Sequence, residues 1–310
     1  MKVVVTGSNG FIGKPLCHLL REHGHVVKSI VRDNPHKDDI AVGDISLVDH
    51  WSELFYGYDA VVHLAALVHE QKPSSTSLYD KINTYTVETL MHAAAQVGVK
   101  RFVFLSTAAV YNNHCVSPYK ETDVPSPATD YGRSKLNAEY LITRFCKSSQ
   151  LTSTVFRPPM VYGPNAKANF KALVKLVDSG MPLPLASIAN MRSFIYVENL
   201  AHIIEACLHQ RAMENEIFNV SDLHDLSTTE LVQMIAKHLG KKERLFHFPS
   251  GMMRVMATAI GKRTIADKLL DSFRLDCSKI TSYINWTPPF TVEQAIEMSV
   301  SPYRKYPEVG

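Results

Sequence analysis

Tyr131 and Lys135 stand four residues apart in the chain. If this segment is helical, both side chains project from one face, and an ammonium can stabilise the neighbouring phenolate. Such contact would lower the pKa of the tyrosine from about 10 and allow it to give or take a proton. The spacing also arises by chance in 310 residues, so it predicts proton transfer only in combination with a second motif.

That second motif is a glycine-spaced turn after the apolar run 3–5. Its glycines are Gly7, Gly10 and Gly13. In such a turn, backbone N–H groups approach a pyrophosphate at a helix N-terminus, and a Cβ atom would block the approach. A plain strand-to-helix turn needs one glycine rather than three. We therefore predict a dinucleotide site that also includes Asn9, Phe11 and Ile12.

Short β-branched runs alternate with helical patterns in the first half of the chain. Strands are predicted at 3–5, 26–31, 60–64 and 101–105, and helices at 12–23, 78–97 and 131–146. This alternation predicts a parallel sheet with right-handed crossovers and helices on both faces. The predicted fold class is α/β, a Rossmann-type doubly wound parallel sheet with a smaller C-terminal α/β substrate lobe.

The composition and the pattern of the sequence change after Arg157-Pro158-Pro159. Prolines become denser, and helical patterns at 197–209 and 228–239 alternate with short extended pieces. We predict a dinucleotide-binding Rossmann domain over 1–160 and a second lobe over 161–310. The two should be interleaved, because later strands are expected to return to the first sheet.

Composition narrows the classes of function. Thirty-three Lys+Arg against 30 Asp+Glu give a net charge of +3, without a basic block, so nucleic-acid binding is not expected. The five cysteines are scattered and form no Cys-x-x-Cys, so no metal site is predicted and a reducing compartment fits. There is no room for a signal peptide, and no apolar run approaches the roughly 18 residues of a membrane span. We expect a cytoplasmic protein.

Further cofactor contacts are expected where parallel strands end. Asp44, followed by Ile45, could accept a hydrogen bond from an adenine amino group or could instead cap a helix. Asn83 and His69 are weaker candidates, each equally explained as a surface polar residue. The end of the strand predicted at 60–64 supplies small or apolar residues that an ordinary packed corner would also use: Leu64, Ala65 and Ala66.

The end of the second strand bears on the type of cofactor. An acidic residue there would bind the ribose 2′-hydroxyl of NAD, whereas an arginine favours the 2′-phosphate of NADP. Arg32 follows Val31 directly, so we favour NADP(H). NAD remains the alternative, because Asp33 comes next and Arg32 could be a plain surface charge.

Taken in order, these motifs resemble the extended short-chain dehydrogenase/reductase family, in its NAD(P)-dependent nucleotide-sugar epimerase, dehydratase and reductase branch. The resemblance covers nearly the whole chain. It rests on Thr6-Gly7-x-x-Gly10-x-x-Gly13, His63-Leu64-Ala65-Ala66, Ser106-Thr107-Ala108-Ala109-Val110-Tyr111, Tyr131-x-x-x-Lys135, Arg157-Pro158-Pro159-x-Val161-Tyr162-Gly163-Pro164, Arg192-Ser193-Phe194-Ile195-Tyr196-Val197, and Trp286 before Pro288.

The resemblance implies a role for each member of the catalytic set. Tyr131 would be the general acid/base, and Lys135 would orient the nicotinamide ribose and lower the pKa of Tyr131. Thr107 would hold the reacting oxygen where the family more often has serine. Ser106 is the fallback for that role and, with Pro158, a further cofactor contact; its other explanation is hydrogen bonding at the strand end.

Two alanines after Thr107 narrow the reaction that the resemblance implies. Relatives that eliminate water between C5 and C6 carry an acid pair there, and 3,5-epimerising relatives place a cysteine nearby. This chain has Ala108 and Ala109. Hydride transfer at C4 of a nucleotide sugar remains, and it serves either a 4-keto reductase or a 4-epimerase.

The second lobe should bind the nucleotide diphosphate. By resemblance Arg192 is the expected pyrophosphate contact, because a guanidinium offers paired donors; an ordinary surface arginine is the other explanation. Met160 replaces the asparagine usual in the family, and a second phosphate-binding arginine motif is missing. Asn169, Arg263 or Arg274 could compensate.

Three functions are thus open from the sequence. The first choice is an NADP(H)-linked 4-keto reductase of a UDP-2-acetamido-dideoxyhexulose in surface-polysaccharide biosynthesis. The alternative is a UDP-glucose or UDP-N-acetylglucosamine 4-epimerase that keeps its NAD, and the third is a non-catalytic NADP-sensing regulator. Relatives also use the helices predicted at 78–97 and 131–146 as a four-helix dimer interface. We therefore expect a homodimer, in which Ala93, Ala94 and Ala95 would allow close approach unless they pack on the sheet.

Overall fold

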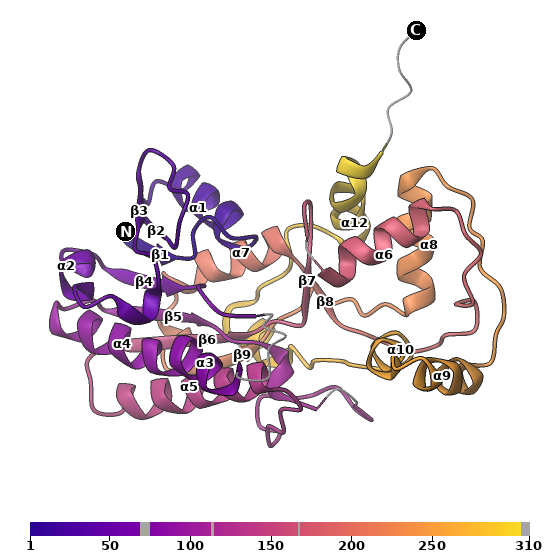
Figure 1. Ribbon diagram of the computed structural model, residues 1–310. Helices are drawn as coiled ribbons and strands as arrows, with labels where there is room; N and C mark the ends of the chain where they lie inside the picture. The colour runs from indigo at the N-terminus through magenta and orange to yellow at the C-terminus, as the bar shows by residue number, and fades with distance from the viewer. Residues whose placement is uncertain (69–74, 113–114, 167, 305–310) are drawn as a thin grey trace, which may run out of the picture.

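The computed structural model describes residues 1–68, 75–112, 115–166 and 168–304. His69 lies outside these residues. Figure 1 shows a sheet covered by helices, with a second, largely helical lobe beside it. The sheet and its helices are formed by the first half of the chain together with a later strand.

The sheet has seven strands, all parallel, in the order β3-β2-β1-β4-β5-β6-β9. The strands are β1 (Lys2–Thr6), β2 (Val26–Val31), β3 (Asp39–Ala41), β4 (Ala60–His63), β5 (Arg101–Leu105), β6 (Thr152–Arg157) and β9 (Glu216–Asn219). The order reverses between β1 and β4, and ligands of open α/β sheets bind at the carboxyl ends of strands at such a switch point.

Successive residues of the buried strands point to opposite faces of the sheet. Val3 and Val5 join the core beneath α1 (Gly13–Glu22) and α7 (Val197–Cys207), whereas Val4 joins the core beneath the helices of the other face. Those helices are α2 (Trp51–Phe55), α4 (Thr86–Gln96) and α5 (Asp130–Cys146). The predicted doubly wound α/β fold is confirmed.

The single helix predicted at 78–97 is wrong in detail. The chain forms α3 (Ser75–Asp80), a π-helix η2 (Lys81–Tyr85) and then α4. Side-chain hydrogen bonds explain the interruption: within η2, Asn83 donates to Ser134 Oγ over 3.1 Å and Thr84 donates to Ser134 O over 2.9 Å. The extra residue of a π-turn directs both side chains toward α5.

The second lobe has its own apolar core around a two-stranded parallel sheet, β7 (Met160–Tyr162) with β8 (Phe194–Tyr196). Its helices are α6 (Ala168–Asp178), α8 (Thr228–Leu239), α9 (Ser250–Ala259), α10 (Arg263–Leu270) and α12 (Val292–Val300). The chain also returns to the first core, since α7 packs on α1, β9 extends the sheet, and Ile280 of α11 (Ser278–Ile284) is buried there. The domain limits at 160 and 161 stay a prediction.

Short 3-10 turns complete the described elements: η1 (Ile45–Leu47), η3 (Ala108–Val110), η4 (Arg211–Met213) and η5 (Ser301–Tyr303). Across the described ranges, none of the helices combines the length and the apolar character needed to cross a membrane.

Candidate active site

The glycine turn lies between β1 and α1, and its shape requires two of the three glycines. Gly7 has φ +72°, and a Cβ there would come within 2.9 Å of the Ala65 nitrogen. A Cβ on Gly13 would come within 2.2 Å of the Gly7 carbonyl oxygen. Glycine therefore allows the strand, the turn and the helix to pack closely. Leu64 and Ala65, predicted from the sequence, are the residues against which the turn packs.

The N-terminus of α1 has no side-chain cap at Ile12. Backbone N–H groups at an uncapped helix start, beside a turn without side chains, form a typical anion site. Phe11 and Ile12 pack against the core of the second lobe, so the turn lies where the two lobes meet. Asn9, by contrast, donates from Nδ2 to the backbone oxygen of Asp33 over 3.1 Å.

The end of β2 carries an ion pair. Arg32 and Asp33 follow the last strand residue, Val31, as predicted. Arg32 Nε lies 3.2 Å from Asp33 Oδ2, with both side chains more than half exposed. The arginine that favoured NADP(H) is therefore already paired with the carboxylate that would suit NAD.

Asp44 and Asn83, the polar cofactor contacts predicted from strand ends, have partners within the chain. Asp44 caps η1, accepting from Ser46 N over 2.9 Å and from Ser46 Oγ over 2.7 Å, as the capping alternative predicted. Asn83 is buried and exchanges hydrogen bonds with the backbone of Leu67, at 2.9 and 3.0 Å, in addition to its bond to Ser134. Asn83 therefore ties the segment after β4 to the helix that carries Tyr131.

Tyr131 and Thr107 meet at the carboxyl end of β5. Thr107 follows that strand and caps η3, with its hydroxyl accepting from Ala109 N over 3.1 Å. Tyr131 lies in the first turn of α5, capped by Thr129. The close approach depends on Gly132, where a Cβ would come within 2.3 Å of the Ala109 oxygen. The Thr107 hydroxyl lies close enough to the Tyr131 phenol to affect its pKa.

Burial shifts the pKa values of Tyr131 and Lys135 in opposite directions, and neighbouring groups oppose both shifts. Burial raises the pKa of Tyr131 to about 12, opposed by the Thr107 hydroxyl. Burial lowers the pKa of Lys135 to about 7, opposed by the charge of Glu139. The expectation that Lys135 lowers the pKa of Tyr131 is wrong for this state, because Lys135 Nζ donates to Leu105 O over 2.8 Å and lies 4.3 Å from the Phe104 ring centroid.

A buried ionic network lies behind the site. Glu139 accepts from Ser106 Oγ and forms a salt bridge with Arg157, whose Nε lies 3.1 Å from both carboxylate oxygens. Arg157 also donates to the Tyr111 hydroxyl over 2.7 Å. The hydroxyl of Ser106 is thus directed at Glu139. The sequence reasoning missed Glu139, although it follows Lys135 at the same four-residue spacing that links Lys135 to Tyr131.

Pro158, another predicted cofactor contact, belongs to the frame of the strand end. Its carbonyl accepts from Ala108 N over 2.8 Å, which fixes η3 against the segment after β6. Ile45 is partly buried against the core beneath α4. Ala66 follows Ala65 and is half-buried.

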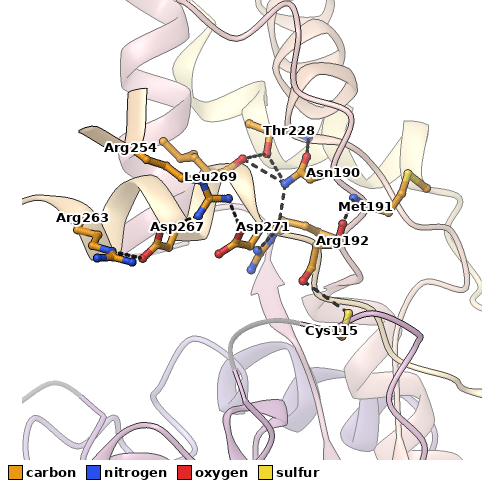
Figure 2. A network of polar contacts seen from close by, with 11 residues as sticks. Cys115, Asn190, Met191, Arg192, Thr228, Arg254, Arg263, Asp267, Leu269 and Asp271 are labelled. Carbon is orange, nitrogen blue, oxygen red and sulfur yellow. Dashed lines mark hydrogen bonds and ion pairs between the residues drawn. The ribbon is translucent and has the colours of Figure 1, made fainter. Parts of the chain in front are cut away.

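Arg192, the predicted diphosphate contact, lies in the second lobe at the centre of the network in Figure 2. Its backbone bridges Leu226 and Phe273, and its Nη1 donates to Asp271 O over 2.8 Å. Arg254 of α9 holds the carboxylate of Asp271 over 2.5 Å. A backbone carbonyl and an aromatic ring thus fix the guanidinium, which has no carboxylate partner among the hydrogen bonds of the described residues.

The three residues that could supply a second phosphate contact lie at different places in the second lobe. Arg274 follows Phe273, next to Arg192, and its Nε lies 2.7 Å from Asp225 Oδ2. Arg263 is exposed on α10 and pairs with Asp267 over 3.7 Å. Asn169 is exposed in the first turn of α6. The structure brings only Arg274 onto the same pair of bridged segments as Arg192.

The family model described as "NAD dependent epimerase/dehydratase family" matches residues 3–221. The chain belongs to this family. A UDP-glucose 4-epimerase of Vibrio cholerae is 34% identical over 97% of this chain and 95% of its own length. An N-acetyl-α-D-glucosaminyl-diphospho-ditrans,octacis-undecaprenol 4-epimerase of Escherichia coli O157:H7 is 26% identical over 96% and 94%. A crystal structure of UDP-glucuronic acid 4-epimerase from Bacillus cereus in complex with NAD superposes with a TM-score of 0.79 at 22% identity, over 96% and 97% of the two chains.

These matches confirm the predicted extended short-chain dehydrogenase/reductase family and the prediction of an NAD(P)-dependent enzyme. They favour the epimerase alternative over the 4-keto reductase that the sequence reasoning placed first. They also give no support to the predicted preference for NADP(H). The roles of individual residues in this epimerase/dehydratase-family protein follow as a proposal.

Proposed function

We propose that the protein is a UDP-sugar 4-epimerase that uses bound NAD. The observation that carries this proposal is the 34% identity with a UDP-glucose 4-epimerase over 97% of the chain. The site supports it, because Tyr131 and Thr107 form a hydroxyl pair and the two residues after Thr107 are alanines. One acid/base suffices for a reaction that leaves C5 and C6 unchanged.

The residues around the glycine turn fit a dinucleotide. Backbone without Cβ atoms at Gly7 and Gly13, next to the uncapped start of α1, suits the diphosphate. NAD rather than NADP is proposed, because Asp33 can accept from a ribose hydroxyl and neutralises Arg32. Relatives that carry NAD in their structures add support.

Each catalytic residue has one proposed task. Tyr131 would take the proton of the sugar 4-hydroxyl and return it to the same oxygen, while Thr107 would donate a hydrogen bond to that oxygen. Lys135 would bind the ribose of the cofactor, from a position fixed by the Leu105 carbonyl. When bound, NAD supplies a hydride acceptor for C4 and a positive charge that favours the phenolate form of Tyr131.

The second lobe would bind the diphosphate of the substrate. Arg192 and Arg274 lie on adjoining segments and can offer guanidinium groups to two phosphates. Asp225 would then compete with substrate for Arg274. Binding at these residues leaves the sugar free to turn within the site, as a 4-epimerase requires.

A substrate panel tests the function. Purified protein is incubated without added cofactor with UDP-glucose and, separately, with UDP-N-acetylglucosamine, and the products are separated by anion-exchange chromatography. We expect at least one pair of C4 epimers to reach equilibrium and NAD to be released on acid denaturation. A 4-keto reductase would instead give no epimer and would consume NADPH with a 4-keto sugar; a regulator would do neither.

A further inference from the structure

Helix α9 carries apolar side chains on two faces. Met253 and Ala257 are partly buried against the core of the second lobe. Met252, Val255 and Met256 are exposed, by 54, 71 and 57%, and Ile260 at the C-cap is exposed by 68%. These four residues follow the spacing i, i+3, i+4, i+8, so they form one stripe directed at solvent.

The stripe lies at the end of the second lobe that is remote from the sheet, where α9 and α10 lie side by side (Figure 1). Ile265 on α10 is exposed by 55%. Burial of such side chains is favourable, and contiguous exposed apolar surface marks a contact site. The side chains are therefore placed to gain free energy from a partner.

The charge of the segment that contains α9 indicates which partner. Residues 241–268 contain seven basic and two acidic side chains, a net charge of +5, while the whole chain has +3 and the remaining residues therefore −2. One of the two acids, Asp267, is held by Arg254 and Arg263. Lys262 and Lys268 are exposed. An apolar helical stripe with a basic surround is complementary to an anionic lipid surface.

The helix is also connected to the candidate substrate site. Arg254 on α9 bonds the Asp271 carboxylate, and Asp271 O accepts from Arg192 (Figure 2). A single residue thus joins the helix to the proposed diphosphate contact.

We propose that the outer face of α9, formed by Met252, Val255, Met256 and Ile260, docks on the surface of an anionic lipid bilayer. The apolar stripe enters the headgroup region, and the exposed Lys262 and Lys268 of the same segment contact the headgroup phosphates. The helix lies in the plane of the interface and does not cross it. This docking is independent of the proposed epimerase activity, since it needs neither substrate nor cofactor.

Sedimentation with vesicles tests the proposal. Tag-free protein is mixed with vesicles of phosphatidylcholine alone or of phosphatidylcholine with phosphatidylglycerol, at low and high salt. We expect about tenfold or greater partitioning to the anionic vesicles, weakened by salt. Equal partitioning to both vesicles, or none, would overturn the proposal.

Variants separate docking from catalysis. The double change Val255→Glu and Met256→Glu should reduce vesicle binding about tenfold or more, and Lys262→Glu with Lys268→Glu should remove the preference for anionic lipid. Val124→Glu, at a residue exposed by 86% in a different part of the chain, is the matched control and should bind like the unaltered protein. Turnover of a soluble UDP-sugar should be unchanged in all three, which also reports correct folding.

The same variants exclude other occupants of the face. If Val255→Glu with Met256→Glu abolishes self-association in light scattering but leaves vesicle binding intact, the face contacts a second copy and the proposal is wrong. If the protein lacks epimerase activity but binds anionic vesicles through α9, the docking proposal holds and only the proposed function fails.

Discussion

At the scale of single residues, the site depends on a partly buried tyrosine. Burial raises the pKa of Tyr131 to about 12, so the phenol is protonated at neutral pH in this state. A protonated phenol beside the Thr107 hydroxyl is well placed as a proton donor. Conversion to the phenolate requires a positive charge beside it, and Lys135 does not supply one directly, since its ammonium contacts the Leu105 carbonyl.

The first prediction concerns this phenol. Tyr131→Phe keeps the ring and removes the acid/base, so kcat should fall about 10²- to 10⁴-fold with little change in the binding of UDP-sugar. Tyr140→Phe, at a residue exposed by 59% on the same helix, should leave kcat unchanged. Steady-state kinetics and calorimetric titration measure the two quantities. Unchanged kcat in Tyr131→Phe would remove the proposed role.

His63 stacks on Phe104, and its Nδ1 shares a hydrogen bond of 2.7 Å with Thr6 Oγ1. Burial, with a smaller contribution from the Lys135 charge, lowers its pKa to about 3. Below about pH 6.5 the histidine is protonated in the unfolded chain but stays neutral in the folded protein until the pH approaches 3. The free energy of unfolding should therefore fall by about 1.4 kcal/mol per pH unit over this range.

His63→Phe should lose that pH dependence. It also loses the hydrogen bond to Thr6, which changes stability by the same amount at every pH and leaves the slope unaffected. Urea unfolding of both proteins between pH 7 and pH 4 measures the difference in slope. If the free energy of unfolding changed with pH equally in the two proteins, His63 would not be held neutral by burial.

At the scale of elements, α5 reaches the end of β5 only because Gly132 has no side chain. A Cβ would come within 2.3 Å of the Ala109 oxygen, and the helix would have to move away from η3. We predict that Gly132→Ala costs about 1–3 kcal/mol of stability and lowers kcat/KM about 10²-fold through misplacement of Tyr131.

Asn137→Ala is the matched control for that change. Asn137 is exposed on α5, and alanine there should leave activity unchanged and slightly favour the helix. Urea unfolding and steady-state kinetics compare the two variants. If Gly132→Ala matched Asn137→Ala in both measurements, the packing of α5 on η3 would not determine the position of Tyr131.

The sequence predicted best those features that depend on residues close together in the chain. The β-branched run 101–105 and the glycine turn each carry their own signal, and both lie where they were predicted. Glu139 and Arg157 were not paired in advance, because their salt bridge joins α5 to β6 across 18 positions of sequence. The hydrogen bond from Lys135 to the Leu105 carbonyl was not predicted either, because it joins α5 to β5 across 30 positions of sequence.

At the scale of the whole molecule, the expected homodimer remains a prediction, but its contact surface changes. Ala93 and Ala94 pack in the core beneath the sheet rather than on an outer face. Tyr85 and Tyr140 are exposed, by 62 and 59%, on the outer side of η2 and α5. They are the residues that a second copy could cover.

We predict a dimer through these helices. Light scattering at micromolar concentration should give twice the mass of the 34.7 kDa chain, and Tyr85→Lys with Tyr140→Lys should give the monomer, because buried like charges would face each other across a two-fold axis. Val124→Glu should remain dimeric. A monomeric unaltered protein would contradict the prediction.

We propose that hydride leaves C4 of a nucleotide sugar and returns to the same carbon. UDP-glucose, or UDP-N-acetylglucosamine if the panel selects it, is prepared with deuterium at C4 and incubated with the purified protein, with no added cofactor. We predict the C4 epimer with its deuterium retained at C4, as seen by NMR and mass spectrometry. Loss of the label from C4 of the epimer, or no epimer together with NADPH consumption on the 4-keto sugar, would contradict it.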